Sequence, residues 1–161
     1  MVTKKTTKTA AKRAKKSPTT KIAPRKAKAR AGAKTLQLGS AAPSLTVNDL
    51  EKSHAWYCDV VGFTVEERWE NAGKLMGVEL RAGNVQLMIG QDDWKKGRDR
   101  KKGDAFRMYC RTTQNVDALA KGIVARGGKL DHEPVDQPWG SREFALTDPD
   151  GFKFTIASEA P

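Results

Sequence analysis

The 161-residue sequence lacks several features that would place it in a special class of protein. Its two cysteines, Cys58 and Cys110, are too few for a disulfide framework. No apolar run approaches the length of a membrane span, and the N-terminus lacks the apolar segment of a secretory signal. These absences predict a cytoplasmic protein that does not engage a membrane.

Acidic residues are absent from positions 1–35, which hold 13 lysines and arginines. The remaining 17 of the 30 basic residues stand against all 19 acidic residues, so positions 36–161 carry a net charge of −2. The basic character of the chain therefore belongs to one end. We divide the chain into a Lys/Ala/Thr-rich basic tail, residues 1–35, and a folded domain, residues 36–161.

The tail has too few large apolar residues to offset the cost of ordering, so we expect it to be disordered. Its cations predict non-specific contact with nucleic acid or another polyanion through release of counterions. A solvated extension that only raises solubility is the alternative. No aromatic residue lies among the cations, so the tail offers no surface on which bases can stack. The candidate contacts are Lys4, Lys5, Lys12, Arg13, Lys15, Lys16, Arg25 and Lys26.

From residue 36 onward, the apolar pattern predicts the same order of elements twice. Asn48 or Asp49 begins the first helix and Gly62 ends it, whereas the second helix begins at Asn115 and ends at the second of two glycines, Gly128. The expected strands are residues 42–47, 63–69, 74–81 and 85–90, then 105–112, 129–133, 142–147 and 152–157. We predict an α+β fold in which two βαβββ repeats form a curved mixed sheet around a shared groove.

Two motifs at a fixed spacing carry a family resemblance. Val-Asn-Asp-Leu-Glu-Lys-Ser at 47–53 precedes an aromatic pair and Val-Gly-Phe at 61–63, and Asp-Pro-Asp-Gly at 148–151 joins two alternating strands as a hairpin. Together they resemble the vicinal oxygen chelate superfamily, which includes glyoxalase I, the bleomycin-resistance proteins and the extradiol dioxygenases. The resemblance covers residues 40–158 and leaves only the tail outside.

The resemblance also identifies where metal ligands are expected. Metal-using members place two histidines and two glutamates around one divalent ion. Here those positions hold Ala42, Met108, Thr155 and either Met88 or Ile89. A methyl, a thioether, a hydroxyl and an aliphatic chain do not make a divalent site. We therefore predict no metal centre and no cofactor.

Ligand binding without a metal is what the resemblance then implies. Bleomycin-resistance members bind a drug in the groove, usually as dimers, with aromatic side chains against its planar groups. We predict a homodimer of this antibiotic-resistance type that binds a small apolar or partly aromatic molecule. The candidate ligand-binding residues are Trp69, Met88, Trp94, Phe106, Met108, Trp139, Phe144 and Thr155. For each of them, packing in the core or at a dimer contact is the alternative.

Two other functions remain open, although the empty ligand positions argue against an enzyme. One is a glyoxalase-like lyase or isomerase, or a dioxygenase, with a displaced metal, or a metal-independent catalyst that uses Glu79 or Glu143 as general base. The other is a nucleic-acid-associated adaptor whose tail is the functional element. The connector of residues 91–104 holds a second basic cluster, which is a mobile flap, a polyanion contact or a plain solvated loop.

Overall fold

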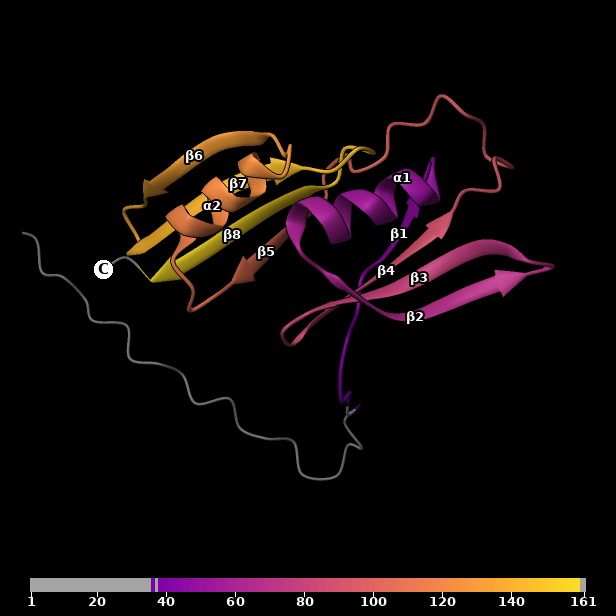
Figure 1. Ribbon diagram of the computed structural model, residues 1–161, viewed down its shortest axis with the longest axis horizontal. Coiled ribbons are helices and arrows are strands. Elements are labelled where there is room, and N and C mark those ends of the chain that lie inside the picture. Colours follow the sequence, from indigo (N-terminus) through magenta and orange to yellow (C-terminus); the bar gives the residue numbers. More distant parts are fainter. Residues whose placement is uncertain (1–35, 37, 160–161) are drawn as a thin grey trace, which may run out of the picture. The chain divides into compact units, whose positions relative to one another are not determined.

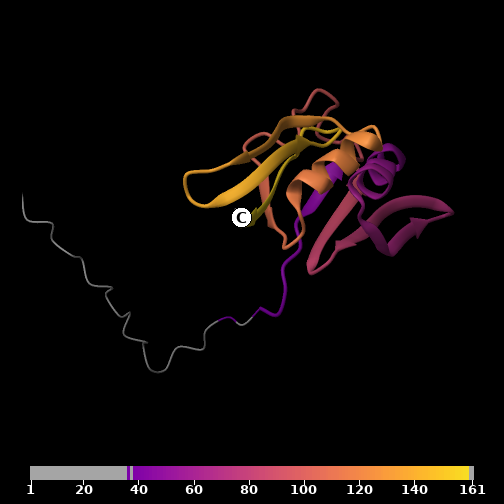
Figure 2. The same ribbon diagram turned by 60° about the vertical axis from the view of Figure 1, so that its left-hand side comes forward.

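The computed structural model describes residue 36 and residues 38–159, and the latter belong to one compact unit (Figures 1 and 2). The first half comprises β1 (Ser44–Val47), α1 (Leu50–Ala55), the π-helix η1 (Trp56–Val61), β2 (Thr64–Asn71), β3 (Lys74–Ala82) and β4 (Val85–Gln91). The second half comprises β5 (Arg107–Arg111), α2 (Val116–Ala125), β6 (Leu130–Asp136), β7 (Ser141–Thr147) and β8 (Lys153–Glu159). The predicted α+β class with two βαβββ repeats is confirmed. None of the helices in residues 38–159 is long and apolar enough to span a membrane.

The two halves share one strand topology. The first sheet has the order β1-β4-β3-β2 and the second has the order β5-β8-β7-β6. In the first sheet β1 runs parallel to β4, and in the second sheet β5 runs parallel to β8. The other neighbouring strands are antiparallel. Within residues 38–159 no strand of one sheet is hydrogen-bonded to a strand of the other. The predicted curved sheet therefore consists of two separate mixed sheets.

Helix boundaries follow from local side-chain chemistry. The Asp49 carboxylate accepts the backbone N–H of Lys52 at 3.0 Å, and the Asn115 side chain accepts the N–H of Ala118 at 2.9 Å, so each caps a helix N-terminus. Gly62, with φ +105°, ends the first helical segment in the left-handed conformation. The π-helical geometry of η1 was not predicted from the sequence.

A single core joins the two halves. Figures 1 and 2 show the helices next to one another between the two sheets, and the Arg126 side chain after α2 donates a hydrogen bond to the Val60 carbonyl in η1 at 2.8 Å. Tyr57 and Phe144 are buried in the same apolar cluster although they come from different halves. Burying a large apolar side chain of this kind stabilises the fold by about 2 kcal/mol.

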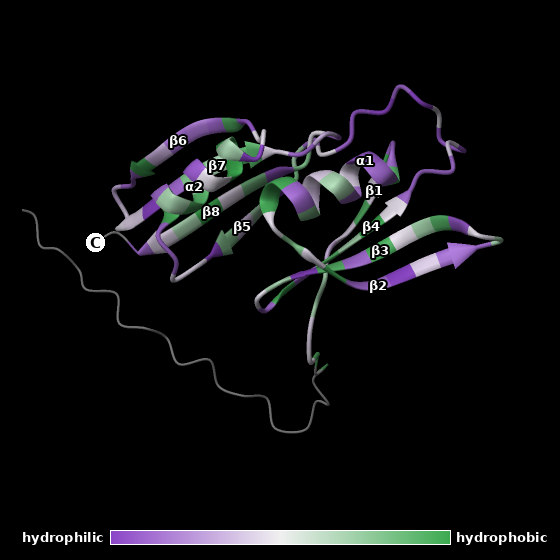
Figure 3. Ribbon diagram, viewed as in Figure 1, coloured by the Kyte–Doolittle hydropathy of each residue, from purple (hydrophilic) through white to green (hydrophobic). Residues whose placement is uncertain are grey.

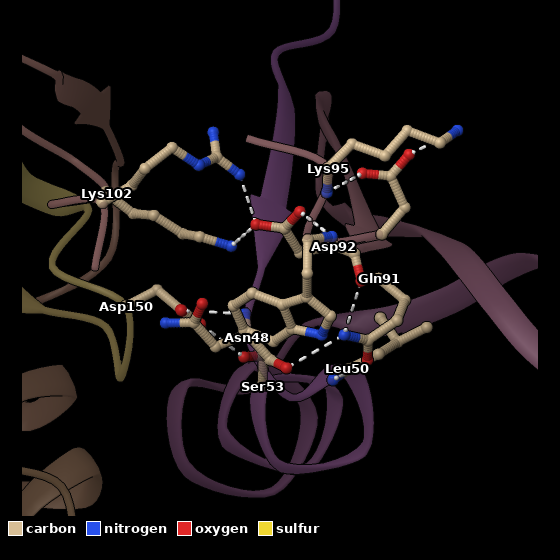
Figure 4. Close-up of polar contacts among 11 residues, drawn as sticks. Asn48, Leu50, Ser53, Gln91, Asp92, Lys95, Lys102 and Asp150 are labelled. Atoms are coloured by element: carbon tan, nitrogen blue, oxygen red, sulfur yellow. Dashed lines mark hydrogen bonds and ion pairs between the residues drawn. The ribbon is translucent and has the colours of Figure 1, made fainter. Parts of the chain in front are cut away.

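The β7–β8 hairpin also contacts the first half. The Asp150 carboxylate accepts the backbone N–H of Asn48 at 2.9 Å and the hydroxyl of Ser53 at 3.1 Å (Figure 4). The Asp148 carboxylate accepts the hydroxyl of Tyr57 at 2.8 Å. The Asp-Pro-Asp-Gly segment thus forms a turn and also fixes α1 and η1 to the second half.

Candidate functional site

Each sheet has one face against the helices and one face turned away from them. Successive side chains in a strand point to opposite faces, so the buried residues identify the orientation of their neighbours. Met88 pairs with Glu79, while the adjacent Ile89 is in the core. Thr155 pairs with Tyr109 on the second sheet, where the adjacent Phe154 is in the core. We call the faces away from the helices the first open face (sheet β1–β4) and the second open face (sheet β5–β8).

The second open face carries a buried carboxylate with neutral partners. Glu143 is 7 % exposed, and its Oε2 accepts hydrogen bonds from the Tyr109 hydroxyl at 2.8 Å and the Ser141 hydroxyl at 3.1 Å. Within residues 38–159 this carboxylate makes no ion pair. Beside it, the Arg107 guanidinium donates to the Thr155 hydroxyl at 2.9 Å. Glu143 therefore keeps acceptor capacity for an N–H or O–H group of a bound molecule.

The first open face has an aromatic ring next to carboxylates. The Trp69 ring lies directly on Gly77, since a Cβ added to that glycine would come within 2.8 Å of the ring. Glu79 accepts the amide of Gln86 at 2.8 Å, and Glu67 pairs with Glu79 across the strands. A side chain at position 77 would displace the indole, so the glycine is needed for this arrangement.

A cleft of about 1610 Å³ lies between the two halves and extends to the second open face. The aromatic side chains of Trp56, Phe63, Tyr109 and Trp139 line it, and so does Ser141. Tyr109 and Ser141 both donate to Glu143, so the polar group of the second open face lies at the edge of the cleft. The volume exceeds that of a typical pocket for a drug-sized molecule.

Comparison with known proteins identifies the family of this chain. The model of the Glyoxalase/Bleomycin resistance protein/Dioxygenase superfamily matches residues 37–156. A bleomycin resistance protein of Geobacillus stearothermophilus is 30 % identical over 118 residues, which cover 67 % of this chain and 87 % of that protein. The chain belongs to the glyoxalase/bleomycin resistance protein/dioxygenase superfamily. The resemblance seen in the sequence is confirmed.

Other members of the superfamily are more distant. A lactoylglutathione lyase of Arabidopsis thaliana is 26 % identical over 123 residues, and this chain spans only 42 % of its length. Among solved structures, TioX from Micromonospora sp. ML1 has a TM-score of 0.62 at 20 % identity and covers 75 % of this chain and 99 % of its own. A superfamily member from Sphaerobacter thermophilus has a TM-score of 0.63 at 24 % identity and covers 77 % and 100 %. These structures show the same fold.

The residues predicted at the superfamily's metal-ligand positions have side chains that do not fit a divalent ion. Met88 and Thr155 lie on the two open faces, Ala42 precedes β1, and Met108 lies on the core side of its strand. No three His, Cys, Asp or Glu side chains of residues 38–159 lie close enough together to hold a metal ion. Tyr109, the neighbour of Met108, lies on the open face. If its phenol is counted in place of Met108, the four side chains still do not suit a divalent ion.

The structure places three predicted groove residues in or against the core. Phe144 is 0 % exposed within the core, and Met108 packs against the same cluster on the core side of β5. Both lie one residue from side chains of the second open face, namely Glu143 and Tyr109. A shift of one residue in a strand reverses the face, which is the physical reason for the error. Phe106 is also packed on the core, with its ring 5.6 Å from the ring of Phe152.

The three predicted tryptophans do not form one surface. Trp69 lies on the first open face, Trp94 lies in the connector between β4 and β5, and Trp139 lies in the β6–β7 turn with 68 % of its surface exposed. Of the eight candidate ligand residues, Trp139 alone lines the cleft. The tail lysines and arginines proposed for nucleic acid lie outside the described residues.

Sequence reasoning missed Tyr109 and Ser141, although the signal for Tyr109 was present. Met108 and Cys110 alternate around Tyr109 as apolar residues, which marks the core side of β5 and leaves the tyrosine on the opposite side. The cysteines are no alternative as nucleophiles. Cys58 and Cys110 are free, and burial raises the pKa of each thiol, which lowers the fraction of reactive thiolate.

Proposed function

We propose that this protein is a metal-independent binding protein for a small, partly aromatic molecule, which it takes up in the cleft at the edge of the second open face. It acts in the cytoplasm as a homodimer, in the manner of drug sequestration. The observation that carries the proposal is the aromatic lining of the cleft next to the Tyr109–Glu143–Ser141 group. Rings supply contact area for planar groups, and the carboxylate supplies orientation.

The relatives support the type of ligand. The protein of Geobacillus stearothermophilus that is 30 % identical to this chain is named a bleomycin resistance protein, and bleomycin is therefore the first compound to test. The residues that we predict at the superfamily's metal-ligand positions are not suitable donors, which supports ligand binding over metal chemistry.

Homodimer formation is part of the proposal because an open face contacts a ligand from one side only and cannot enclose it. Tyr109 is 45 % exposed and Val135, which pairs with Glu143, is 46 % exposed. Large apolar side chains beside a buried carboxylate are unfavourable in water and suit coverage by another surface. A second copy placed over the open face would enclose a ligand that one chain only borders.

Calorimetric titration of the full chain with bleomycin tests the proposal. We expect saturable binding, with affinity reduced about tenfold in Tyr109→Phe, because the hydroxyl that orients Glu143 is lost. Trp139→Ala is expected to weaken binding by a similar factor through lost ring contact. Val124→Ala is the control, because Val124 is 49 % exposed on α2 and does not line the cleft.

Two results would contradict the proposal. One is equal affinity in the native chain, Tyr109→Phe and Trp139→Ala, which would place any binding elsewhere. The other is a stoichiometric divalent metal in native mass spectra of protein purified without added metal. The same spectra report the oligomeric state, and a monomer at micromolar concentration would contradict the dimer.

A metal-independent catalyst is the second candidate, because a buried carboxylate with only neutral partners can accept a proton. Glu143 has this environment, and Glu79 on the first open face is more exposed to solvent. The test uses a compound that the native chain converts. If Glu143→Gln binds this compound normally but its turnover falls at least about a hundredfold, Glu143 is the base. Retained turnover would leave binding as the function.

A further inference from the structure

The cations of the folded part are concentrated in one connector. Six of the 17 lysines and arginines in positions 36–161 lie within residues 95–102. We propose that this connector, residues 92–103, is a preformed contact for the phosphate backbone of a nucleic acid, and we call it the basic loop. It is separate from the cleft and does not depend on the proposed ligand.

A buried carboxylate fixes the basic loop at both ends. The Asp92 side chain is 2 % exposed and accepts the Lys102 ammonium at 2.6 Å, the Arg100 guanidinium, and the backbone N–H of Trp94 at 2.9 Å (Figure 4). The Lys102 side chain is itself only 5 % exposed. The hydrogen bond from Lys102 is the main reason that the pKa of Asp92 falls to about 2, so this carboxylate is charged at neutral pH. The connector is therefore anchored at its two ends by the contact between Asp92 and Lys102.

Within the basic loop, the backbone of Trp94 is strained and two cations lie over its indole ring. Its backbone has φ +60°, a left-handed conformation that is rare for a bulky side chain and costs about 1 kcal/mol. The Arg98 guanidinium lies 4.4 Å from the centre of the indole ring, and the Lys102 ammonium lies 5.1 Å from it. Strain held in place by surrounding contacts is typical of binding loops.

Three cations remain for a partner once these internal contacts are made. Lys96, Arg98 and Lys101 are exposed, and none makes an ion pair with residues 38–159, whereas Lys95 is paired with Asp93. Asp99 is the single acid among positions 95–102. Phosphates that these cations neutralise would release counterions, which drives binding and makes it salt-dependent. Arg98, held on the indole, presents its guanidinium with less loss of side-chain entropy.

The surroundings favour a nucleic acid over an acidic membrane. Residues 95–101 are Lys-Lys-Gly-Arg-Asp-Arg-Lys and contain no apolar side chain that could insert into lipid, and Figure 3 shows the connector after β4 as mostly hydrophilic. Positions 36–161 carry a net charge of −2, so a polyanion is attracted locally and not by the domain as a whole. The same chain has 13 further cations and no acid in positions 1–35.

Fluorescence anisotropy with a labelled DNA duplex tests the proposal on the full chain. The loop variant is Lys96→Gln, Arg98→Gln and Lys101→Gln together. The control is Lys74→Gln, Lys129→Gln and Lys153→Gln together, because these exposed lysines change the net charge equally at other places. At about 100 mM salt, we expect the loop variant to bind at least about tenfold more weakly and the slope of log affinity against log salt to fall by about 2 to 3. The control is expected to lose less than about twofold.

The outcomes separate the possible partners. Equal losses in the loop variant and the control would mean that only net charge matters, which overturns the proposal. Unchanged DNA affinity in the loop variant overturns it as well, and assigns any binding to other residues. Binding of the loop to vesicles of phosphatidylserine and phosphatidylcholine, without a loop effect on DNA, would replace it with a membrane contact. Bleomycin affinity is measured in parallel and should not change in either variant.

Discussion

Two turn regions of this molecule each bury an aspartate, and the two aspartates have opposite electrostatic properties. Asp92 in the basic loop is 4 % exposed and Asp148 in the β7–β8 hairpin is 5 % exposed. Cationic partners, above all Lys102, lower the pKa of Asp92 to about 2. Burial is the largest cause of the raised pKa of Asp148, and the hydrogen bonds from the Tyr57 hydroxyl and two backbone N–H groups offset it only in part. At Asp148 the effect of burial therefore prevails, whereas at Asp92 the hydrogen bond from Lys102 and the nearby cations outweigh it.

The two regions also touch, and breaking this contact should have the largest effect on stability. Gly103 at the end of the basic loop has φ +70°, and a Cβ there would overlap the carbonyl of Gly151 in the hairpin. Since that neighbour is backbone, it cannot move aside cheaply. We expect Gly103→Ala to lower the free energy of unfolding by about 3 kcal/mol. Urea denaturation followed by circular dichroism measures the change.

Gly97 is the matched control for this substitution. It lies in the same loop with φ +87°, but nothing lies within 4 Å of an added Cβ. Gly97→Ala should therefore cost only about 1 kcal/mol, from backbone strain alone. Equal costs at the two positions would show that the loop and the hairpin are not in close contact.

Neutralising each aspartate in turn tests the comparison directly. Asp92→Asn leaves the buried Lys102 ammonium without a counter-charge, whereas Asp148→Asn keeps an oxygen for the N–H groups of Asp150 and Phe152. We expect Asp92→Asn to lower the urea midpoint by more than Asp148→Asn does. A larger loss in Asp148→Asn would mean that the hairpin and not the basic loop depends on its charge.

These contacts also show where sequence reasoning ends. The repeats, both N-caps and the hairpin were predicted because each depends on residues close in sequence, such as Asp49 with Lys52. The faces of β5 and β7 were not, because Met108 and Phe144, which were expected in the groove, lie on the core side of their strands. The buried environment of Asp92 also lay beyond prediction, since burial depends on how both halves pack around residues of the connector.

A smaller effect is expected from the other side of the hairpin contact. Tyr57→Phe removes the hydroxyl that donates to Asp148 at 2.8 Å but keeps the ring in the core. The expected loss is about 1 kcal/mol, since the carboxylate keeps two backbone donors. The free energy of unfolding at neutral pH gives the value. A loss as large as that of Gly103→Ala would mean that the ring has moved.

The smallest expected effect is on the pH dependence of stability. The two aspartates should contribute to it with opposite signs. The folded-state pKa of Asp92 lies below its usual 3.8, so its stabilisation is present above 3.8 and is lost as the pH falls towards about 2. The folded-state pKa of Asp148 lies above 3.8, so the native state binds more protons just above 3.8 and gains stability there as the pH falls. Urea midpoints between about pH 7 and pH 2 should thus show a shallower acid loss in Asp92→Asn than in the native chain. In Asp148→Asn the acid loss should begin at a higher pH, because the compensating gain is gone. If both variants deviate from the native profile in the same direction, the pKa values of the two aspartates are not shifted in opposite directions.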